Sequence, residues 1–165
     1  MIDAKVIDEI LKMFKDEPRE FQTYIERWIR LLESPVPNLR YVAMDIEVES
    51  PVPDKVPDPS EALNKVICVS FVSSEGKKQT FLLKREGFPI GEIQLDGVVE
   101  YFDTENSLLA RVFSIITEYP ILITFNGDEF DLKYLWHRAQ RLGFMKDDIP
   151  IQMGREYALL PYGIH

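Results

Sequence analysis

Two acidic residues, Asp45 and Glu47, lie near the end of the apolar, β-prone segment 41–48. The segment has the length and composition of a strand. Because side chains alternate between the two faces of a strand, Asp45 and Glu47 point to the same side, about 7 Å apart along it. Residues 41–44 are apolar at every position, which predicts a central strand that is buried on both faces.

Two carboxylates at the tip of a buried strand repel each other and resist ionisation, because little water is present to solvate them. A divalent cation such as Mg²⁺ makes the pair tolerable, since hard metal ions bind carboxylate oxygens. The alternative is that both side chains have left the sheet and face water. The spacing of Asp45 and Glu47 supports both interpretations equally, so the rest of the chain has to decide between them.

A third acid, Asp131, follows a second buried strand, predicted at 121–125, and the turn 126–128. It belongs to the first turn of a helix predicted over 129–142. On its own, an acid in this position more often stabilises the helix dipole than binds a ligand. Asn126, at the end of the strand, could hydrogen-bond a substrate or hold the turn.

The order of the strands in the sheet decides whether the three acids meet. In an α/β sheet, ligands bind beyond the C-terminal ends of the strands. If the strands at 41–48 and 121–125 are parallel neighbours, Asp131 is delivered to the same edge as Asp45 and Glu47. Three acids on one edge favour a cation site more strongly than any one of them alone.

The remaining periodicities predict two helices, three antiparallel strands, a helix, a strand and a final helix. Helices are predicted over 3–15, 18–33, 104–119 and 129–142, and strands over 41–48, 65–73, 79–84 and 121–125; segment 98–102 could form another short strand. Thr104 or Asp103 caps the third helix, and Gly143 ends the last one. Segment 88–97 is ambiguous between a short excursion and a small hairpin.

Residues 1–38 are predicted to form an N-terminal helical segment, and residues 39–165 a separate domain. The second helix has an apolar stripe that is predicted to be buried as core or packing surface. The stripe consists of Phe21, Tyr24, Ile25, Trp28 and Leu32.

Composition limits the classes of protein to which this chain can belong. Its 165 residues suit one domain, and 45% hydrophobic residues are enough for a core. The net charge of −9 argues against gripping duplex nucleic acid through a broad basic face, although metal ions could neutralise the acids at a narrow site. No apolar run approaches the roughly 20 residues that cross a membrane. The single cysteine, Cys68, predicts an intracellular protein of the cytoplasm or nucleoid.

Two short motifs resemble those of the exonuclease domain of family B DNA polymerases, in particular the archaeal branch. Met44-Asp45-Ile46-Glu47 resembles the first exonuclease motif, in which Asp-Ile-Glu ends the first strand of the sheet. The segment 126–131, an Asn followed by Phe-Asp, resembles the second, and the intervening Glu105 and Pro120 also fit the family. Each motif alone is common by chance, and only their combination over residues 40–165 is specific.

The resemblance implies a fold and an activity. The fold would be α/β, a ribonuclease H-like mixed β-sheet flanked by helices, with an N-terminal helical appendage. The activity would be 3′-to-5′ proofreading, that is, phosphodiester hydrolysis at the 3′ end of single-stranded DNA with two ions of Mg²⁺ or Mn²⁺. The partners in the full-length protein would be primer–template DNA and the remaining polymerase domains, with no membrane.

The resemblance also implies a role for each site residue. Asp45 would match the acid that bridges both metal ions, and Glu47 the ligand of one metal close to the terminal nucleotide. Asp131 would match the acid of the second motif. Asn126 and Phe130 would match residues that surround the substrate end.

Four basic residues on or after the last predicted helix are candidates for contacts to the DNA backbone. They are Lys133, Arg138, Arg141 and Lys146. The alternative is that they form an ordinary solvated helix face.

The third motif of the family, a Tyr followed four positions later by an Asp, does not occur after Asp131, and Tyr157 is followed at that spacing by Pro161. We therefore expect that the domain 39–165 is C-terminally incomplete, binds metal weakly and shows little or no nuclease activity. The apolar tail 157–165 predicts either a chain cut inside a larger protein or a terminal strand that docks on the sheet.

Two alternatives remain open beside a fragment of a family B polymerase. One is a stand-alone 3′-to-5′ nuclease of the same superfold. The other is a non-catalytic ribonuclease H-like scaffold for protein contacts, because a fold by itself does not determine function. The acid set Asp45, Glu47 and Asp131 argues against the scaffold.

Overall fold

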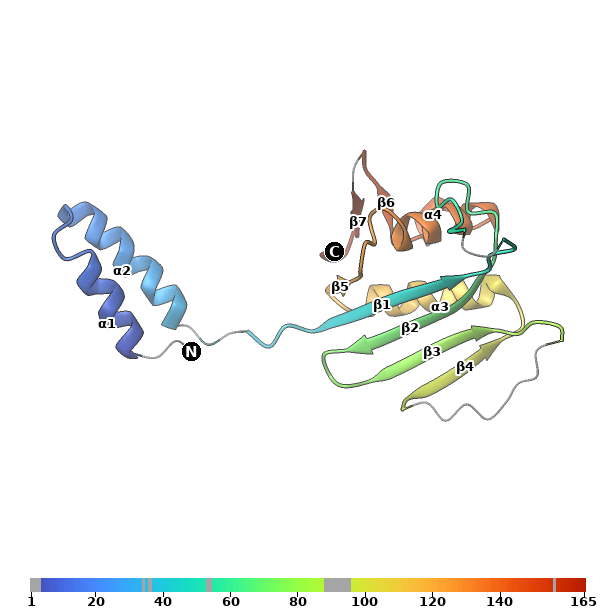
Figure 1. Ribbon diagram of the computed structural model, residues 1–165, viewed down its shortest axis with the longest axis horizontal. Helices are drawn as coiled ribbons and strands as arrows, with labels where there is room; N and C mark the ends of the chain where they lie inside the picture. Colours follow the sequence, from blue (N-terminus) through green and yellow to red (C-terminus); the bar gives the residue numbers. More distant parts are fainter. Residues whose placement is uncertain (1–3, 34, 36, 53–54, 88–95, 156) are drawn as a thin grey trace. The chain divides into compact units, whose positions relative to one another are not determined.

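The computed structural model describes residues 4–33, 35, 37–52, 55–87, 96–155 and 157–165. The chain forms two compact units, Met1–Asn38 and Leu39–His165 (Figure 1). The first unit is a pair of helices, α1 (Ala4–Met13) and α2 (Arg19–Glu33). The second unit contains the helices α3 (Glu105–Glu118) and α4 (Asp131–Arg141), the 3-10 turn η1 (Lys146–Asp148) and the strands β1 (Tyr41–Val48), β2 (Val66–Ser73), β3 (Lys78–Leu83), β4 (Val98–Phe102), β5 (Ile121–Ile123), β6 (Gln152–Met153) and β7 (Ala158–Leu159).

Five strands of the second unit form one mixed sheet in the order β4-β3-β2-β1-β5. Strands β1, β2 and β3 are antiparallel, whereas β4 runs parallel to β3 and β5 runs parallel to β1. The predicted class, an α/β fold with a mixed sheet flanked by helices, is confirmed, and it is consistent with a ribonuclease H-like domain. The parallel pairing of β1 and β5, on which the meeting of the acids depends, is confirmed as well.

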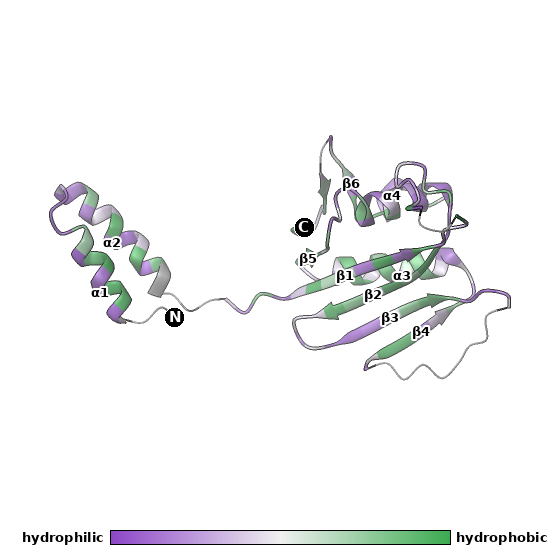
Figure 2. Cartoon of the chain, in the orientation of Figure 1, coloured by the Kyte–Doolittle hydropathy of each residue, from purple (hydrophilic) through white to green (hydrophobic). Residues whose placement is uncertain are grey.

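The core occupies one face of the sheet. Val42, Met44 and Ile46 of β1 are buried there, together with apolar residues of α3 and α4. Helix α3 lies along this face and contacts β2, β3 and β4 (Figure 1). Hydrophilic residues appear in the C-terminal half of β1 (Figure 2), where Asp45 and Glu47 alternate with the hydrophobic Ile46 and Val48.

The opposite face of β1 is open in the described part of the chain. Tyr41 is 40% exposed, Val72 of β2 is 47% exposed, and Ala43 is half-buried. The prediction that residues 41–44 are buried on both faces was therefore wrong. The physical reason is that the described helices of this unit pack into a core on one face only, although β1 has a strand neighbour on each side.

The aromatic stripe of α2 also differs from the prediction. Phe21, Tyr24 and Trp28 are exposed, Ile25 is half-buried, and the side chain of Leu32 lies outside the described residues. A pair of helices has a single seam, which cannot bury all the apolar residues of an aromatic-rich helix. The exposed rings instead contact one another along α2, with centroids 6.4 Å apart between Phe21 and Tyr24 and 6.1 Å apart between Tyr24 and Trp28.

The ends of the elements agree closely with the sequence signals. Thr104 caps α3 by accepting a hydrogen bond from the Ser107 N–H, and Gly143 adopts a φ of 86° just after α4. The ambiguous segment 88–97 falls mostly on residues 88–95, which lie outside the described part of the chain. The tail docks beside β5 through a bridge between Ile164 and Ile121, as one of the two alternatives predicted.

Candidate active site

Asp45 and Glu47 lie in β1 on the open face of the sheet, and both are exposed. On the neighbouring strand β2, Ser70 is paired with Asp45 and Cys68 with Glu47. Burial raises the pKa of the Cys68 thiol, and the nearby charges of Glu47 and Asp45 raise it further. The two acids therefore share one face, as predicted, and they have not left the strand.

The structure places an open hollow of about 430 Å³ next to Asp45. Its wall includes Ser70 and Val72 of β2 and Phe125, which follows β5 and is 91% exposed. β5 pairs with β1 only as far as Ala43 opposite Ile123, so Asp45 lies beyond the end of β5. β5 therefore does not pair with the edge of β1 next to Asp45, and the segment that follows β5 borders the hollow at this edge.

Asp131 is the first residue of α4 and is only 3% exposed. Burial raises the pKa of Asp131 to about 6, and the charge of Asp45 contributes to the rise. Hydrogen bonds from the backbone amides of Asp131 and Ile46, and the charge of His165, act in the opposite direction. The buried carboxyl therefore lies at the edge of β1, within electrostatic reach of Asp45.

The turn between β5 and α4 positions Asp131. Asn126 has a φ of 59°, a left-handed conformation that asparagine tolerates, and its carbonyl accepts hydrogen bonds from the amides of Glu129 and Phe130. The backbone of Phe130, with a φ of −126° and a ψ of −77°, is not helical, so α4 begins at Asp131 rather than at the predicted Glu129. Asn126 thus holds the turn through its backbone, and its side chain is exposed.

Gly127 allows the turn to approach β5 closely. A Cβ atom at this position would lie 1.9 Å from Oγ1 of Thr124, which is far inside van der Waals contact. The carbonyl of Gly127 also accepts a hydrogen bond of 2.9 Å from the amide of Leu132, in the first turn of α4. A side chain at this position would therefore displace the segment that carries Asp131.

Phe130 and His165 complete the surroundings of Asp131. Phe130 is half-buried, and its ring centroid lies 5.5 Å from that of Tyr134. His165 shares a hydrogen bond of 2.7 Å between Nε2 and Oγ1 of Thr124, and its Nδ1 lies 3.5 Å from Oδ1 of Asp128. Sequence reasoning missed His165 and Thr124, because no spacing in the chain signals a contact between residues 41 positions apart.

The donor set at this edge fits a hard divalent cation in chemistry, because it consists of carboxylate oxygens and includes a buried carboxyl that resists ionisation. Asp45 and Asp131 interact directly through their charges, and Glu47 lies two residues farther along the same face of β1. Among the described residues, no three His, Cys, Asp or Glu side chains form a group that could hold a metal ion. The three-acid metal site therefore stays a prediction.

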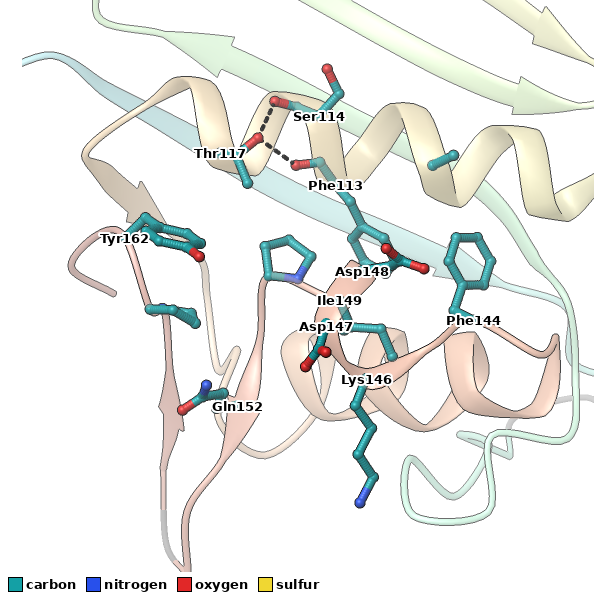
Figure 3. Close-up of a pocket in the computed structure, with 13 residues that line it drawn as sticks. Phe113, Ser114, Thr117, Phe144, Lys146, Asp147, Asp148, Ile149, Gln152 and Tyr162 are labelled. Atoms are coloured by element: carbon teal, nitrogen blue, oxygen red, sulfur yellow. Dashed lines mark hydrogen bonds between the residues drawn. The ribbon is translucent and has the colours of Figure 1, made fainter.

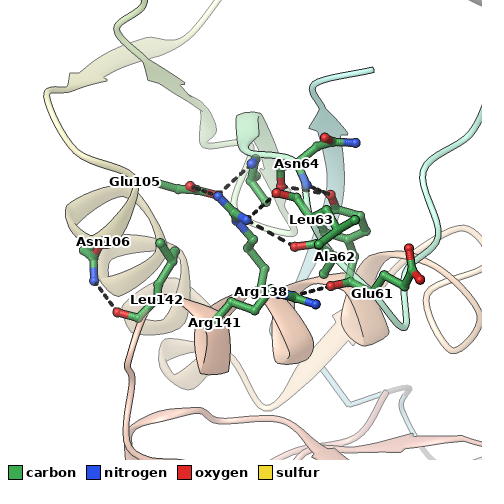
Figure 4. A network of polar contacts seen from close by, with 11 residues as sticks. Glu61, Ala62, Leu63, Asn64, Glu105, Asn106, Arg138, Arg141 and Leu142 are labelled. Atoms are coloured by element: carbon green, nitrogen blue, oxygen red, sulfur yellow. Dashed lines mark hydrogen bonds and ion pairs between the residues drawn. The ribbon is translucent and has the colours of Figure 1, made fainter. Parts of the chain in front are cut away.

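A buried ion pair lies elsewhere in the unit, between Arg138 of α4 and Glu105 of α3 (Figure 4). Nε and Nη2 of Arg138 donate to the two carboxylate oxygens of Glu105 at 2.8 and 2.7 Å, and Nη1 donates to the carbonyls of Ala62 and Leu63 at 3.2 and 2.7 Å. Glu105 also accepts from the amide of Val66 at 2.8 Å. The suggestion that Arg138 contacts DNA was therefore wrong, because its guanidinium is buried and donates its hydrogen bonds to groups of the protein itself.

The same network holds the loop between β1 and β2 on α4. The hydroxyl of Tyr134 donates to the carbonyl of Asn64 at 2.9 Å and accepts from its amide at 3.2 Å. Arg141 donates from Nε to the carbonyl of Glu61. Of the four basic residues proposed for DNA contacts, two are thus committed to this loop.

The other two basic residues line different cavities. Lys133 lines one of about 830 Å³ beside the loop between β1 and β2. Lys146, with Asp147 and Asp148, lines one of about 580 Å³ against α3 (Figure 3). No residue of β1 or of the turn before α4 lines the cavity at Lys146, so that cavity is separate from the acids.

No helix in the described part of the chain combines the length and the hydrophobicity needed to cross a bilayer.

The sequence model of the family "DNA polymerase family B, exonuclease domain" matches residues 12–157.

Three archaeal relatives, each named DNA polymerase 1, match almost the whole chain. Those of Saccharolobus solfataricus and Sulfolobus acidocaldarius are 39% and 41% identical over 99% of this chain, and the chain covers 19% of each. The relative from Aeropyrum pernix is 38% identical over 100% of this chain, which covers 17% of that protein. The chain thus spans about one fifth of the length of these relatives. It belongs to the exonuclease-domain family of the family B DNA polymerases.

Proposed function

We propose that this chain carries a 3′-to-5′ proofreading exonuclease site, which removes nucleotides from the 3′ end of single-stranded DNA by phosphodiester hydrolysis. Asp45, Glu47 and Asp131 are its catalytic, metal-binding acids, and its cofactor is Mg²⁺ or Mn²⁺, two ions per site. The observation that carries the proposal is the buried carboxyl of Asp131 beside Asp45. Two such acids are favourable together as anions only when a cation neutralises them.

The protein residues hold this site in complementary ways. The amide of Ile46 in β1 and the position of Asp131 at the start of α4, through the helix dipole, both favour the anion of Asp131. Asp45 and Glu47 project from the exposed face of β1, where a cation and a DNA strand both have access. Asn126 and Phe130 flank Asp131 and are proposed to surround the strand end.

When bound, two metal ions would supply an activated water and would stabilise the charge on the departing 3′-oxygen. The protein supplies the carboxylate ligands, two of them exposed on β1 and one, Asp131, buried at the start of α4. For a full-length protein of the length of these relatives, the proposed partners are primer–template DNA and the other polymerase domains. The proposed location is inside the cell.

Cation binding is the first test, because the sequence lacks the third motif of the family and hydrolysis by these 165 residues is expected to be slow or absent. We expect Mn²⁺ to raise the midpoint of thermal unfolding of the unchanged chain, since an ion that binds only the native state stabilises it by mass action. Asp45→Asn and Asp131→Asn should each remove most of this rise.

Asp148→Asn is the matched control, because Asp148 is an exposed aspartate in η1, away from β1. Its Mn²⁺-dependent rise should equal that of the unchanged chain. An equal rise in all three variants would show that the ion binds elsewhere, and the proposed site would then be wrong.

A further inference from the structure

The C-terminal segment of the second unit lies along β5, next to the turn that leads to Asp131. The amide of Leu122 donates to the carbonyl of Ile164, and the amide of Ile164 donates to the carbonyl of Pro120, each at 2.9 Å. The segment runs parallel to β5, as the bridge between Ile121 and Ile164 shows. The next residue, His165, is thereby placed at the end of β5.

The imidazole of His165 connects the end of β5 with the turn that follows it. Nε2 lies 2.7 Å from Oγ1 of Thr124, and Nδ1 lies 3.5 Å from Oδ1 of Asp128. In the tautomer that the nearby carboxylate favours, Nδ1 carries the proton and Nε2 accepts from the Thr124 hydroxyl. The side chain of His165 is only 13% exposed, so the ring is held between these two partners.

Asp128 and Gly127 add two further contacts between the turn and the C-terminal segment. Oδ1 of Asp128 accepts a hydrogen bond of 2.6 Å from the amide of Ala158 in β7. The ring of His165 packs closely on Gly127, since a Cβ atom there would lie 3.0 Å from Nε2. Thr124, Asp128 and His165 therefore form one polar cluster, the Thr124–Asp128–His165 cluster.

This cluster borders both parts of the proposed cation site. Thr124 lines the hollow next to Asp45. Asp128 belongs to the turn that leads into α4, three residues before Asp131. The charge of His165 also acts on Asp131, which places the ring within electrostatic reach of the buried carboxyl. The cluster thus fixes the turn to β5 on one side and to the C-terminal segment on the other.

We propose that His165 is a positioning residue for the cation site, because its ring, held between Thr124 and Asp128, keeps the turn in the conformation that places Asp131 beside Asp45. A residue that orients a metal ligand without touching the metal typically changes metal affinity by about 10- to 100-fold when it is lost. The inference rests on the proposed function and deepens it, since it names what holds the buried acid of that site. His165 touches no reacting atom.

Two pairs of variants test the cluster. His165→Leu and Asp128→Ala remove its polar contacts, whereas His165→Gln and Asp128→Asn keep side-chain groups that can make them. Asp128→Asn also removes the charge of this residue, so it controls for direct attraction of the ion by that charge. The Kd of Mn²⁺, measured by electron paramagnetic resonance of the free ion at a temperature at which every variant is folded, should rise about tenfold in His165→Leu and Asp128→Ala. It should change little in their conservative counterparts.

Tyr119→Phe is the matched control for a loss of stability alone. It removes one hydrogen bond, of 3.1 Å from the Tyr119 hydroxyl to Glu75, just before the start of β5 and thus at the opposite end of this strand from the turn. Its Kd for Mn²⁺ should equal that of the unchanged chain. Weakening as large as in His165→Leu would overturn the proposal, because affinity would then follow general stability.

Amide hydrogen exchange at Leu132, without metal, reports on the turn itself. The Leu132 amide donates to the carbonyl of Gly127 at 2.9 Å, so a turn that opens more often should exchange this amide faster. We expect faster exchange in His165→Leu and Asp128→Ala than in the unchanged chain and in Tyr119→Phe. Unchanged exchange in both cluster variants would overturn the proposal.

The response of Asp45→Asn separates this inference from the proposed function. If Asp45→Asn weakens Mn²⁺ binding, an unchanged Kd in both His165→Leu and Asp128→Ala would overturn the positioning role. If Asp45→Asn leaves the Kd unchanged, the proposed cation site fails, and with it the role of the cluster in cation binding. Faster exchange at Leu132 would in that case still show that His165 holds the turn.

Discussion

Glu105 and Asp131 are both buried acids of the second unit, but their surroundings differ. The carboxylate of Glu105 receives two hydrogen bonds from Arg138 and one from the amide of Val66. Asp131 takes part in none of the ion pairs among the described residues, and its burial, together with the charge of Asp45, opposes its ionisation. One acid has its counter-charge inside the protein, and the other faces a second negative charge.

The difference separates a structural charge from a functional one. A buried, fully hydrogen-bonded pair neutralises itself, so removing one partner leaves an uncompensated charge inside the protein. A buried acid beside another acid lacks such compensation, and such perturbed groups cluster at functional sites. We therefore assign Glu105 and Arg138 to holding the loop between β1 and β2, and Asp131 to binding a cation from outside.

Arg138→Met should cause the largest loss of stability. It removes the counter-charge of Glu105 and the donor to the carbonyls of Ala62 and Leu63, so we expect the free energy of unfolding to fall by roughly 4 kcal/mol. Urea unfolding measures the loss. The double variant Glu105→Leu, Arg138→Met should recover part of it, because no buried charge remains; a double variant less stable than the single one would contradict the comparison.

Gly127→Ala should have an intermediate effect. Its Cβ would overlap Oγ1 of Thr124, and overpacking of this kind costs about 3 kcal/mol at the upper end of its usual range. The same displacement should weaken Mn²⁺ binding, because the turn carries Asp131. Adding Thr124→Ala removes the closest clash and should restore part of both losses in urea unfolding and Mn²⁺ titration. A stable Gly127→Ala variant with normal Mn²⁺ binding would show that the turn does not position the acid.

Asp131→Asn should stabilise the metal-free protein, opposite in sign to Arg138→Met. Since the pKa of Asp131 is raised to about 6, the native state binds its proton more tightly than the unfolded state does. The contribution of the Asp131 carboxyl to the free energy of unfolding is therefore fully present below about pH 4 and is lost as the pH rises to about 6. We expect the variant to exceed the unchanged chain by about 3 kcal/mol above pH 6, because each unit of pKa difference is worth about 1.4 kcal/mol.

Urea unfolding from pH 4 to 8, without metal, measures this difference, which should shrink as the pH falls from 6 to 4. With Mn²⁺ present above pH 6, the order should reverse, because only the unchanged chain binds the ion. A variant that is less stable than the unchanged chain at pH 7 without metal would mean that Asp131 is a structural acid like Glu105.

Local patterns were sufficient to predict β1, β5 and α4, because each carries a strong periodicity and clear end signals. The same patterns placed Asp45, Glu47 and Asp131 near one edge once β1 and β5 were taken as parallel neighbours. The motifs that resemble family B exonucleases pointed to the family to which the chain belongs.

What lay beyond prediction depends on contacts between distant parts of the chain. An arginine in a basic helix looks like a solvent-facing residue, and only the packing of α4 on α3 reveals that Arg138 binds Glu105. Periodicity shows that residues 41–44 are apolar but not what covers them, so the open face of β1 was missed. His165 reaches Thr124 only because the tail docks beside β5.

The pKa of Asp131, followed by ¹³C NMR of its carboxyl in the unchanged chain and in Asp45→Asn, tests the central claim most directly. Without metal, we expect a pKa of about 6 in the unchanged chain and a lower one in Asp45→Asn, because one contribution to the rise is gone. Saturating Mg²⁺ should lower the apparent pKa in the unchanged chain, since the ion binds the anion. An ordinary aspartate pKa that responds neither to Asp45→Asn nor to Mg²⁺ would contradict the cation site at the edge of β1.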